Sequence, residues 1–262
     1  MRILLTNDDG IHAPGLALLA RAAARLGEVF VVAPHSERSA VSRGLSLYQP
    51  LRLRELRPCW HECDGTPADA IYVALHHMKL APDLVLSGVN PGPNLGHDIH
   101  YSGTAAAALE GAWHGVPSIA LSHDSRDTVP FGHMDDSLVA LLQNLLPLLS
   151  APPIALNVNL PSVAKGPWRG VCMTFTGSRR YSTEVHQRTD PRGRDYLWIG
   201  GARVAMSDLP GSDCNALKDG YVSVTPLGDD LSLHNRLADM QRSLDAAADP
   251  APPSGPAGQE LP

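Results

Sequence analysis

The chain has 262 residues, a formal net charge of −6 and 44% hydrophobic residues. This length and composition are typical of one large α/β domain, or of a domain with an appendage, that buries most of its apolar surface. Nucleic acid polymers are not expected partners, because a net acidic chain lacks the excess of basic side chains that binding to phosphate backbones requires. The apolar runs are too short or too often interrupted to span a membrane, so we expect no membrane segment.

The N-terminus does not resemble a signal peptide, since one positive charge is followed by only three apolar residues before two acids. We therefore expect a cytoplasmic protein. Its few cysteines are too sparse for a disulfide scaffold and should remain thiols in a reducing compartment. If the segment around Cys59, His61 and Cys63 is a strand, these side chains share a face and admit a soft-metal site, although a half-buried structural strand is the favoured interpretation.

Short apolar runs alternate with helix-forming segments through the first part of the chain. Arg2–Thr6 predicts a strand, and residues 16–26 predict a helix with Pro14 near its start and Gly27 beyond its end. We expect further strands at 28–33, 84–87, 118–122 and 154–158, and further helices at 67–78, 104–114 and 135–149. This alternation predicts an α/β fold, a doubly wound and mostly parallel three-layer sandwich of the Rossmann-like kind, because parallel strands need helical crossovers.

The pattern changes after about residue 165. Strands are expected at 170–176, 195–199 and 221–225 without helices of similar length between them, followed by a helix at 231–247. Residues 249–262 hold five prolines and two glycines and are expected to be disordered. The predicted organisation is an α/β core at 1–165, a β-rich extension with a C-terminal helix at 166–248, and the tail at 249–262.

In open parallel sheets the ligand site lies beyond the carboxyl ends of the strands. That rule selects four loops, namely residues 7–10, 34–46, 87–104 and the segment that begins at Ser122. The first loop carries the adjacent acids Asp8 and Asp9, which repel each other unless a cation lies beside them. The other groups at this edge are hydroxyl and amide oxygens, which favour Mg²⁺ or Mn²⁺ over zinc. On these residues alone, a turn with a helix cap stays open as the alternative.

The third loop ends in Tyr101-Ser102-Gly103-Thr104 and enters an Ala-rich helix directly. Backbone N–H groups, two hydroxyls and the helix dipole at such a start are suited to a phosphate group. The alternative is an ordinary Ser or Thr helix cap. Phosphate-ester hydrolysis needs both an acidic pair that can bind a metal and a helix start that can bind an anion. Because both are expected at one edge of the sheet, a phosphate-binding role is favoured over a simple helix cap.

These residues carry a resemblance to a known family. MRILLTNDDG, Ala33-Pro34 followed by Arg38-Ser39, the run SGVNPGPNLG with YSGTAAAALEG, and GYVSVTPLGDDLS resemble the SurE family of metal-dependent 5′/3′-nucleotidases over about residues 1–235. The resemblance implies one divalent cation per subunit, held by Asp8, Asp9, Ser39 and Asn90. It also implies a phosphate site lined by Asn94, Ser102, Gly103 and Thr104.

Ala40 and His97 depart from the family pattern, because glycine and an acidic residue are common at these two positions. His97 and His100 could touch substrate, but exposed loop residues are the simpler interpretation. The Arg179-Arg180 pair could clamp a phosphate or stack on a base, and a solvated surface pair is favoured.

The predicted function is hydrolysis of nucleoside 5′- and 3′-monophosphates to nucleoside and phosphate, with short-chain polyphosphate as a further candidate substrate. The catalytic residues would be Asp8, Asp9, Asn94, Ser102 and Thr104, with direct attack by water favoured over an aspartyl-phosphate route through Asp8. The alternative is a non-enzymatic phosphoacceptor of the receiver type. A receiver needs a lysine beyond a late strand, and the lysines of this chain are Lys79, Lys165 and Lys218.

Assembly into a homodimer or tetramer is also expected. Isolated hairpins are marginally stable unless they pack against something, and the C-terminal helix places Leu233, Leu237 and Met240 along one stripe. We expect the extension and this helix to reach across to a second subunit, as the family resemblance also implies.

Overall fold

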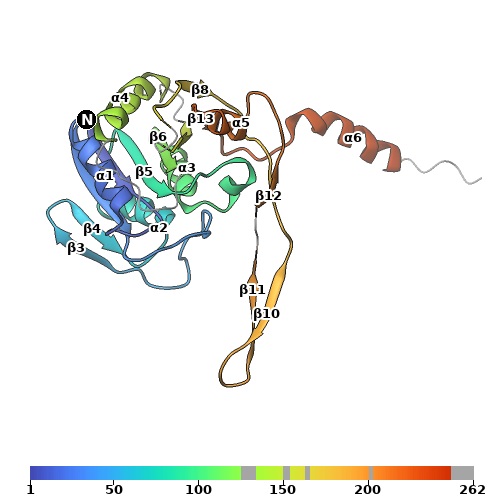
Figure 1. Cartoon of the computed structure of the whole chain (residues 1–262), viewed down its shortest axis with the longest axis horizontal. Coiled ribbons are helices and arrows are strands. Elements are labelled where there is room, and N and C mark those ends of the chain that lie inside the picture. Colours follow the sequence, from blue (N-terminus) through green and yellow to red (C-terminus); the bar gives the residue numbers. More distant parts are fainter. Residues whose placement is uncertain (125–133, 150–153, 163–165, 201–202, 249–262) are drawn as a thin grey trace, which may run out of the picture. The chain divides into compact units, whose positions relative to one another are not determined.

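The computed structural model of the chain describes residues 1–124, 134–149, 154–162, 166–200 and 203–248 (Figure 1). It divides into two compact units, Met1–Gly228 and Asp229–Pro262, which are described separately. The predicted disordered tail at 249–262 lies outside the described residues.

The first unit is built on a nine-stranded sheet in the order β3-β4-β2-β1-β5-β6-β7-β13-β8. Strands β4, β2, β1, β5, β6 and β7 run parallel, whereas β3 and β13 are antiparallel to their neighbours β4 and β7. The mostly parallel, doubly wound prediction is therefore confirmed. The strands are β1 Arg2–Thr6, β2 Glu28–Pro34, β3 Leu53–Arg57, β4 Trp60–Cys63, β5 Leu84–Pro91, β6 Ser118–His123, β7 Ala155–Leu160, β8 Val171–Met173 and β13 Val222–Leu227.

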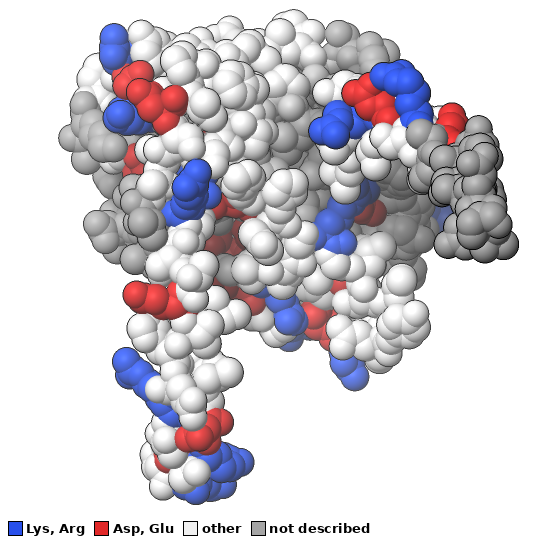
Figure 2. All heavy atoms as spheres, turned by 90° about the vertical axis from the view of Figure 1, so that its right-hand side faces the viewer, with Lys and Arg blue, Asp and Glu red and all other residues white. Residues whose placement is uncertain are grey.

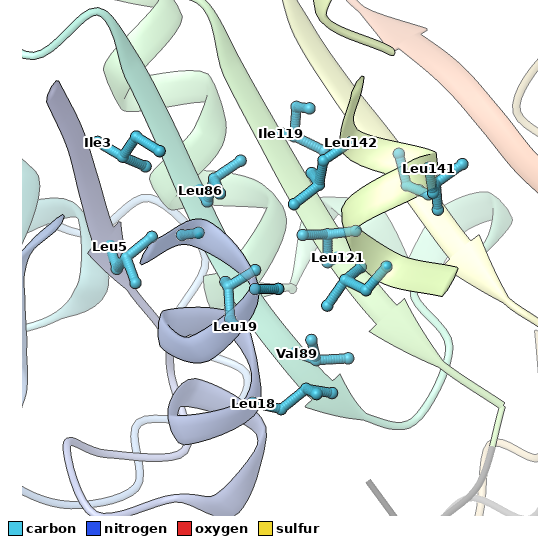
Figure 3. Close-up of a cluster of buried hydrophobic side chains, with 14 of the residues drawn as sticks. Ile3, Leu5, Leu18, Leu19, Leu86, Val89, Ile119, Leu121, Leu141 and Leu142 are labelled. Carbon is cyan, nitrogen blue, oxygen red and sulfur yellow. The ribbon is translucent and has the colours of Figure 1, made fainter. Parts of the chain in front are cut away.

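Helices cover both faces of this sheet, which completes the three layers. Helices α1 (Pro14–Ala24) and α4 (Asp135–Leu145) supply one buried apolar cluster, in which their leucines pack against side chains of β1, β5 and β6 (Figure 3). Helices α2 (Pro67–Tyr72) and α3 (Gly103–Trp113) pack on the opposite face. A π-helical turn, Val73–His77, continues α2, and a 3₁₀ turn, Leu146–Leu149, continues α4.

The start of helix α1 lies directly against β5, and its sequence permits this contact. Pro14 occupies the first turn, where its missing N–H costs nothing, and Leu16, Leu18 and Leu19 are fully buried. A Cβ on Gly15 would lie 1.9 Å from the carbonyl oxygen of Val89 in β5, so a residue without a side chain is needed there. This contact fixes the loop between β1 and α1 against the sheet.

The chain after residue 165 differs in part from the predicted extension. Strands β13 and β8 join the main sheet, because β13 pairs along its length with β7. The division predicted at residue 165 therefore marks a change of sequence pattern within one continuous sheet. A short helix, α5 (Asp213–Lys218), precedes β13.

A long hairpin leaves this unit (Figure 1). Its stem is formed by β9 (Arg179–Tyr181) with β12 (Arg203–Met206), and its outer part by β10 (Val185–Thr189) with β11 (Asp195–Ile199). Basic and acidic side chains gather at its outer end (Figure 2), where Asp190 pairs with Arg194. The sequence did not predict strands β3, β9, β10 and β12, because these segments are short or highly polar. The second unit contains α6 (His234–Ala248), close to its predicted range.

Two sequence expectations outside the catalytic edge can be compared with this structure. In the described part of the chain, no helix is long and apolar enough to cross a membrane. Cys59 lies in the turn before β4, with a positive φ of 65°, and so does not share a strand face with Cys63. All four cysteines are free, and the described residues hold no metal-binding group of three or more His, Cys, Asp or Glu side chains, so the soft-metal alternative finds no support.

Candidate active site

The first loop of the predicted site follows β1 and is folded tightly. Asn7 Nδ2 donates to the carbonyl oxygen of Gly10 at 2.9 Å, and Gly10 has a φ of +99°, which favours glycine. Ile11 N–H donates to the carbonyl oxygen of Pro34 at 2.7 Å, tying this loop to the end of β2. Asp8 is buried and Asp9 is half-buried at the carboxyl edge of the sheet.

A nearby positive charge would stabilise the ionised forms of Asp8 and Asp9. Burial raises the pKa of Asp8, although the hydrogen bond from Thr104 opposes that effect. Burial, followed by the charges of Asp8 and Glu37, raises the pKa of Asp9 to about 7. Asp9 Oδ2 is buried and has no hydrogen-bond partner in the described part of the chain. A cation beside these oxygens would satisfy both groups.

The remaining predicted metal ligands come from the next two loops at the same edge. Arg38 N–H donates to the carbonyl oxygen of Asp8 at 2.7 Å, which holds the adjacent Ser39 against the first loop. Ser39 Oγ donates to Glu37 Oε1 at 2.8 Å. Asn90 lies at the end of β5, next to β1, and its Nδ2 donates to the carbonyl oxygen of Gly92 at 2.6 Å. This leaves the Asn90 side-chain oxygen for a cation, so the set offers oxygen ligands of the hard type.

The start of α3 is packed directly on Asp8. Thr104 Oγ1 donates to Asp8 Oδ1 at 2.5 Å, and a Cβ on Gly103 would lie 2.8 Å from the Asp8 Cβ. Ser102 caps the helix, because its Oγ accepts from Ala105 N–H at 3.0 Å. The capping alternative is thus realised at Ser102 through its oxygen, and its hydroxyl hydrogen stays available to a ligand. The Thr104 hydrogen is committed to Asp8.

Asn94 is held by polar residues of two neighbouring strands, and the two asparagines among them were not predicted from the sequence. Its N–H donates to Asn159 Oδ1 at 2.8 Å, and its Nδ2 donates to Ser122 Oγ at 2.8 Å. Its carbonyl oxygen accepts from Asn157 Nδ2 at 2.8 Å and from Asn159 Nδ2 at 3.1 Å. The available signal was the pair of asparagines at alternate positions of an otherwise apolar strand, since buried amides need partners.

The described histidines near this edge differ in their exposure. His97 and His100 belong to the 3₁₀ turn Gly96–His100 and are exposed, in agreement with the simpler interpretation. His123 ends β6 and is buried, and that burial lowers its pKa, so its imidazole is neutral at pH 7.

The prediction of a solvated surface pair is wrong for Arg179. Its side chain is 4% exposed and forms an ion pair with Asp98 of the third loop, whereas Arg180 is exposed. The error has a physical cause: the two arginines are adjacent in a strand, so their side chains leave opposite faces.

The receiver alternative finds no support in the described residues. Lys79 lines a small cavity with Arg2 at the amino end of β1, the edge opposite Asp8. Lys218 is the last residue of α5, and Lys165 lies outside the described residues.

An acidic pair and a helix start at the carboxyl edge of a doubly wound sheet are typical of α/β proteins that bind phosphate groups. The family model for survival protein SurE matches residues 3–183 of this chain. The chain therefore belongs to the SurE family, which confirms the resemblance.

Individual relatives cover most of the chain. The 5'-nucleotidase SurE of Anaeromyxobacter sp. (strain Fw109-5) is 50% identical over 231 residues, 87% of this chain and 89% of the relative. That of Myxococcus xanthus (strain DK1622) is 46% identical over 242 residues, 91% of this chain and 92% of the relative. Among solved structures, the SurE protein from Aquifex aeolicus is 37% identical, with a TM-score of 0.81 over 94% of this chain and 100% of that one.

Proposed function

We propose that this protein is a divalent-metal-dependent phosphomonoesterase that hydrolyses nucleoside 5′- and 3′-monophosphates to nucleoside and phosphate. The observation that carries the proposal is the packing of the start of α3 on Asp8. This packing places a helix N-terminus suited to a phosphate group beside a carboxylate suited to a cation. Relatives named 5'-nucleotidase SurE support the substrate class. Short-chain polyphosphate is the further substrate that we would screen.

We propose one divalent cation per subunit, Mg²⁺ or Mn²⁺, held by Asp8, Asp9, Ser39 and Asn90. When bound, such a cation neutralises charge on the phosphoryl group and helps to orient the attacking water. The raised pKa of Asp9 and its unpartnered buried Oδ2 support this assignment.

The proposed phosphate site consists of Asn94, Ser102, Gly103 and Thr104. Ser102 can donate its hydroxyl hydrogen, the helix start presents backbone N–H groups, and Asn94 Nδ2 has a second hydrogen beyond the one given to Ser122. Thr104 contributes by holding Asp8 Oδ1 in place. Direct attack by water is favoured because both carboxylates of the pair are proposed to hold the cation, which leaves neither free to be phosphorylated.

We also propose that the protein assembles as a homodimer or tetramer in the cytoplasm. Residues 1–165 would carry catalysis, and residues 166–248 would carry the subunit contacts. The hairpin exposes 62% of Trp198 and 90% of Ile199, and α6 exposes 56% of Leu237, which supports burial of these side chains by a second copy. Four free cysteines are compatible with a reducing compartment.

The test is phosphate release from nucleoside 5′- and 3′-monophosphates by the full chain with Mg²⁺ or Mn²⁺. We expect turnover that a chelator abolishes and added cation restores. Absence of release with either cation, or full activity in chelator, would overturn the proposal.

A further inference from the structure

The loop that carries Asn94 is held from the stem of the long hairpin. The carbonyl oxygen of Pro93 accepts from Arg179 Nη1 at 3.3 Å, and the N–H of Asn94, in the same peptide group, donates to Asn159 Oδ1 at 2.8 Å. Both ends of the peptide group before Asn94 are therefore fixed, one by the hairpin stem and the other by β7.

The same arginine also binds a carboxylate of this loop. Arg179 and Asp98 form an ion pair in which the side chains are 4% and 16% exposed. Charges so far removed from water depend strongly on each other, and removal of one leaves the other uncompensated. An unpaired Asp98 would also place negative charge in the loop that is proposed to receive a phosphate.

A third contact draws the loop and the stem together at the backbone. Asp213, which is fully buried, accepts from Gly96 N–H at 2.9 Å and from Gly177 N–H at 2.8 Å, one through each oxygen. A Cβ on Gly96 would lie 3.0 Å from the carbonyl oxygen of Gly177. The segment leading into β9 thus lies directly on the loop, and Arg179 reaches Pro93 and Asp98 from a fixed position.

We propose that Arg179 is a positioning residue, which acts with Asp98 to hold Asn94 where it binds the phosphate group of the substrate. The hairpin stem then sets the affinity of the site for phosphate, separately from the proposed cation ligands in the loops after β1 and β2 and at the end of β5. This inference rests on the proposed phosphomonoesterase function.

The decisive comparison is Arg179→Met against Arg180→Met, because the two arginines are neighbours in β9 and only the first is buried on the loop. For Arg179→Met we expect kcat/KM to fall by about tenfold or more, mainly through KM, the scale of one lost charge-assisted contact. The inhibition constant of inorganic phosphate should rise in parallel, whereas Mn²⁺ affinity measured by calorimetry should stay within about twofold of the parent. Arg180→Met should match the parent in all three measurements.

A folded Arg179→Met protein with the parent's kcat/KM and phosphate inhibition constant would overturn the inference, as would equal losses of phosphate and Mn²⁺ affinity. If this variant does not fold, Asp98→Asn replaces it, since the amide keeps the side-chain volume and removes the charge partner. We expect weaker phosphate inhibition in Asp98→Asn, and parental values would overturn the inference. Failure of the proposed function is distinguishable, because then the parent itself releases no phosphate, and phosphate binding by calorimetry in the same variants decides about Arg179.

Discussion

The carboxyl edge of the sheet and the hairpin with α6 are incomplete in different ways. At the edge, backbone and side-chain hydrogen bonds connect the loops within one chain, and burial together with the charges of Asp8 and Glu37 raises the pKa of Asp9 to about 7. In the hairpin, β10 and β11 pair along their length, and both the hairpin and α6 expose large apolar side chains. The carboxyl edge would be stabilised by a cation and is suited to an anionic substrate. The hairpin and α6 would be stabilised by burial of their apolar side chains, which another copy of the chain can provide.

Truncation separates the two regions most sharply and has the largest expected effect. A chain ending at Ala248 should keep its size and activity, because the Pro-rich remainder has no apolar periodicity. A chain ending at Gly228 loses α6 and should give monomers or aggregate. Light scattering on both truncated proteins measures this, and a soluble, active monomer from the shorter one would contradict a role of α6 in assembly.

Replacement of a single carboxylate should abolish most of the activity at the carboxyl edge of the sheet. Asp9→Asn keeps the side-chain shape and removes a charge, so activity should fall at least about a hundredfold, or about 2.7 kcal/mol in transition-state stabilisation. Circular dichroism and Tm should show an intact fold. Asp136→Asn on the exposed face of α4 is the matched control and should leave activity unchanged. Normal turnover by purified Asp9→Asn would refute the metal assignment.

The main features of the first region could be predicted from local sequence. Apolar runs that alternate with helix formers determine a parallel sheet, and the rule for its carboxyl edge then selects Asp8, Asp9 and the Ser102–Thr104 segment. The supports of Asn94 were not predicted, because Asn157 and Asn159 come from a strand more than sixty residues away. Their role depends on strand order, which local sequence does not encode.

The burial of Arg179 could not be predicted for a related reason. Its partners in the third loop are more than eighty residues away, and nothing in the local sequence GSRRYS distinguishes it from Arg180. The strands of the hairpin were missed in part because their residues are exposed and polar, so that they lack the alternation of a half-buried strand.

The helix start offers a smaller and more specific test of the catalytic edge. Ser102→Ala removes a hydroxyl donor and should cost about 1–3 kcal/mol in kcat/KM without loss of metal affinity. Thr104→Ala should cost a similar amount but should also weaken Mn²⁺ binding, because Thr104 donates to Asp8. Steady-state kinetics and calorimetric Mn²⁺ titration distinguish the two effects. Thr104→Ser keeps the hydroxyl and should recover most of the loss; parental kinetics in both alanine variants would mean that the hydroxyls serve only the helix.

The smallest expected effect concerns backbone strain beside Ser39. Ala40 has a φ of 58°, in the left-handed region, at the position where the family resemblance favours glycine. A Cβ is unfavourable there, whereas glycine adds entropy to the unfolded chain, so the two effects partly cancel. Ala40→Gly should raise the free energy of unfolding by up to about 1 kcal/mol, because removal of the strained Cβ outweighs the entropy. Urea denaturation measures it, with Ala17→Gly on the exposed face of α1 as a control of opposite sign, expected to destabilise by about 1 kcal/mol. Equal destabilisation by both substitutions would show that the loop tolerates Ala40 without strain.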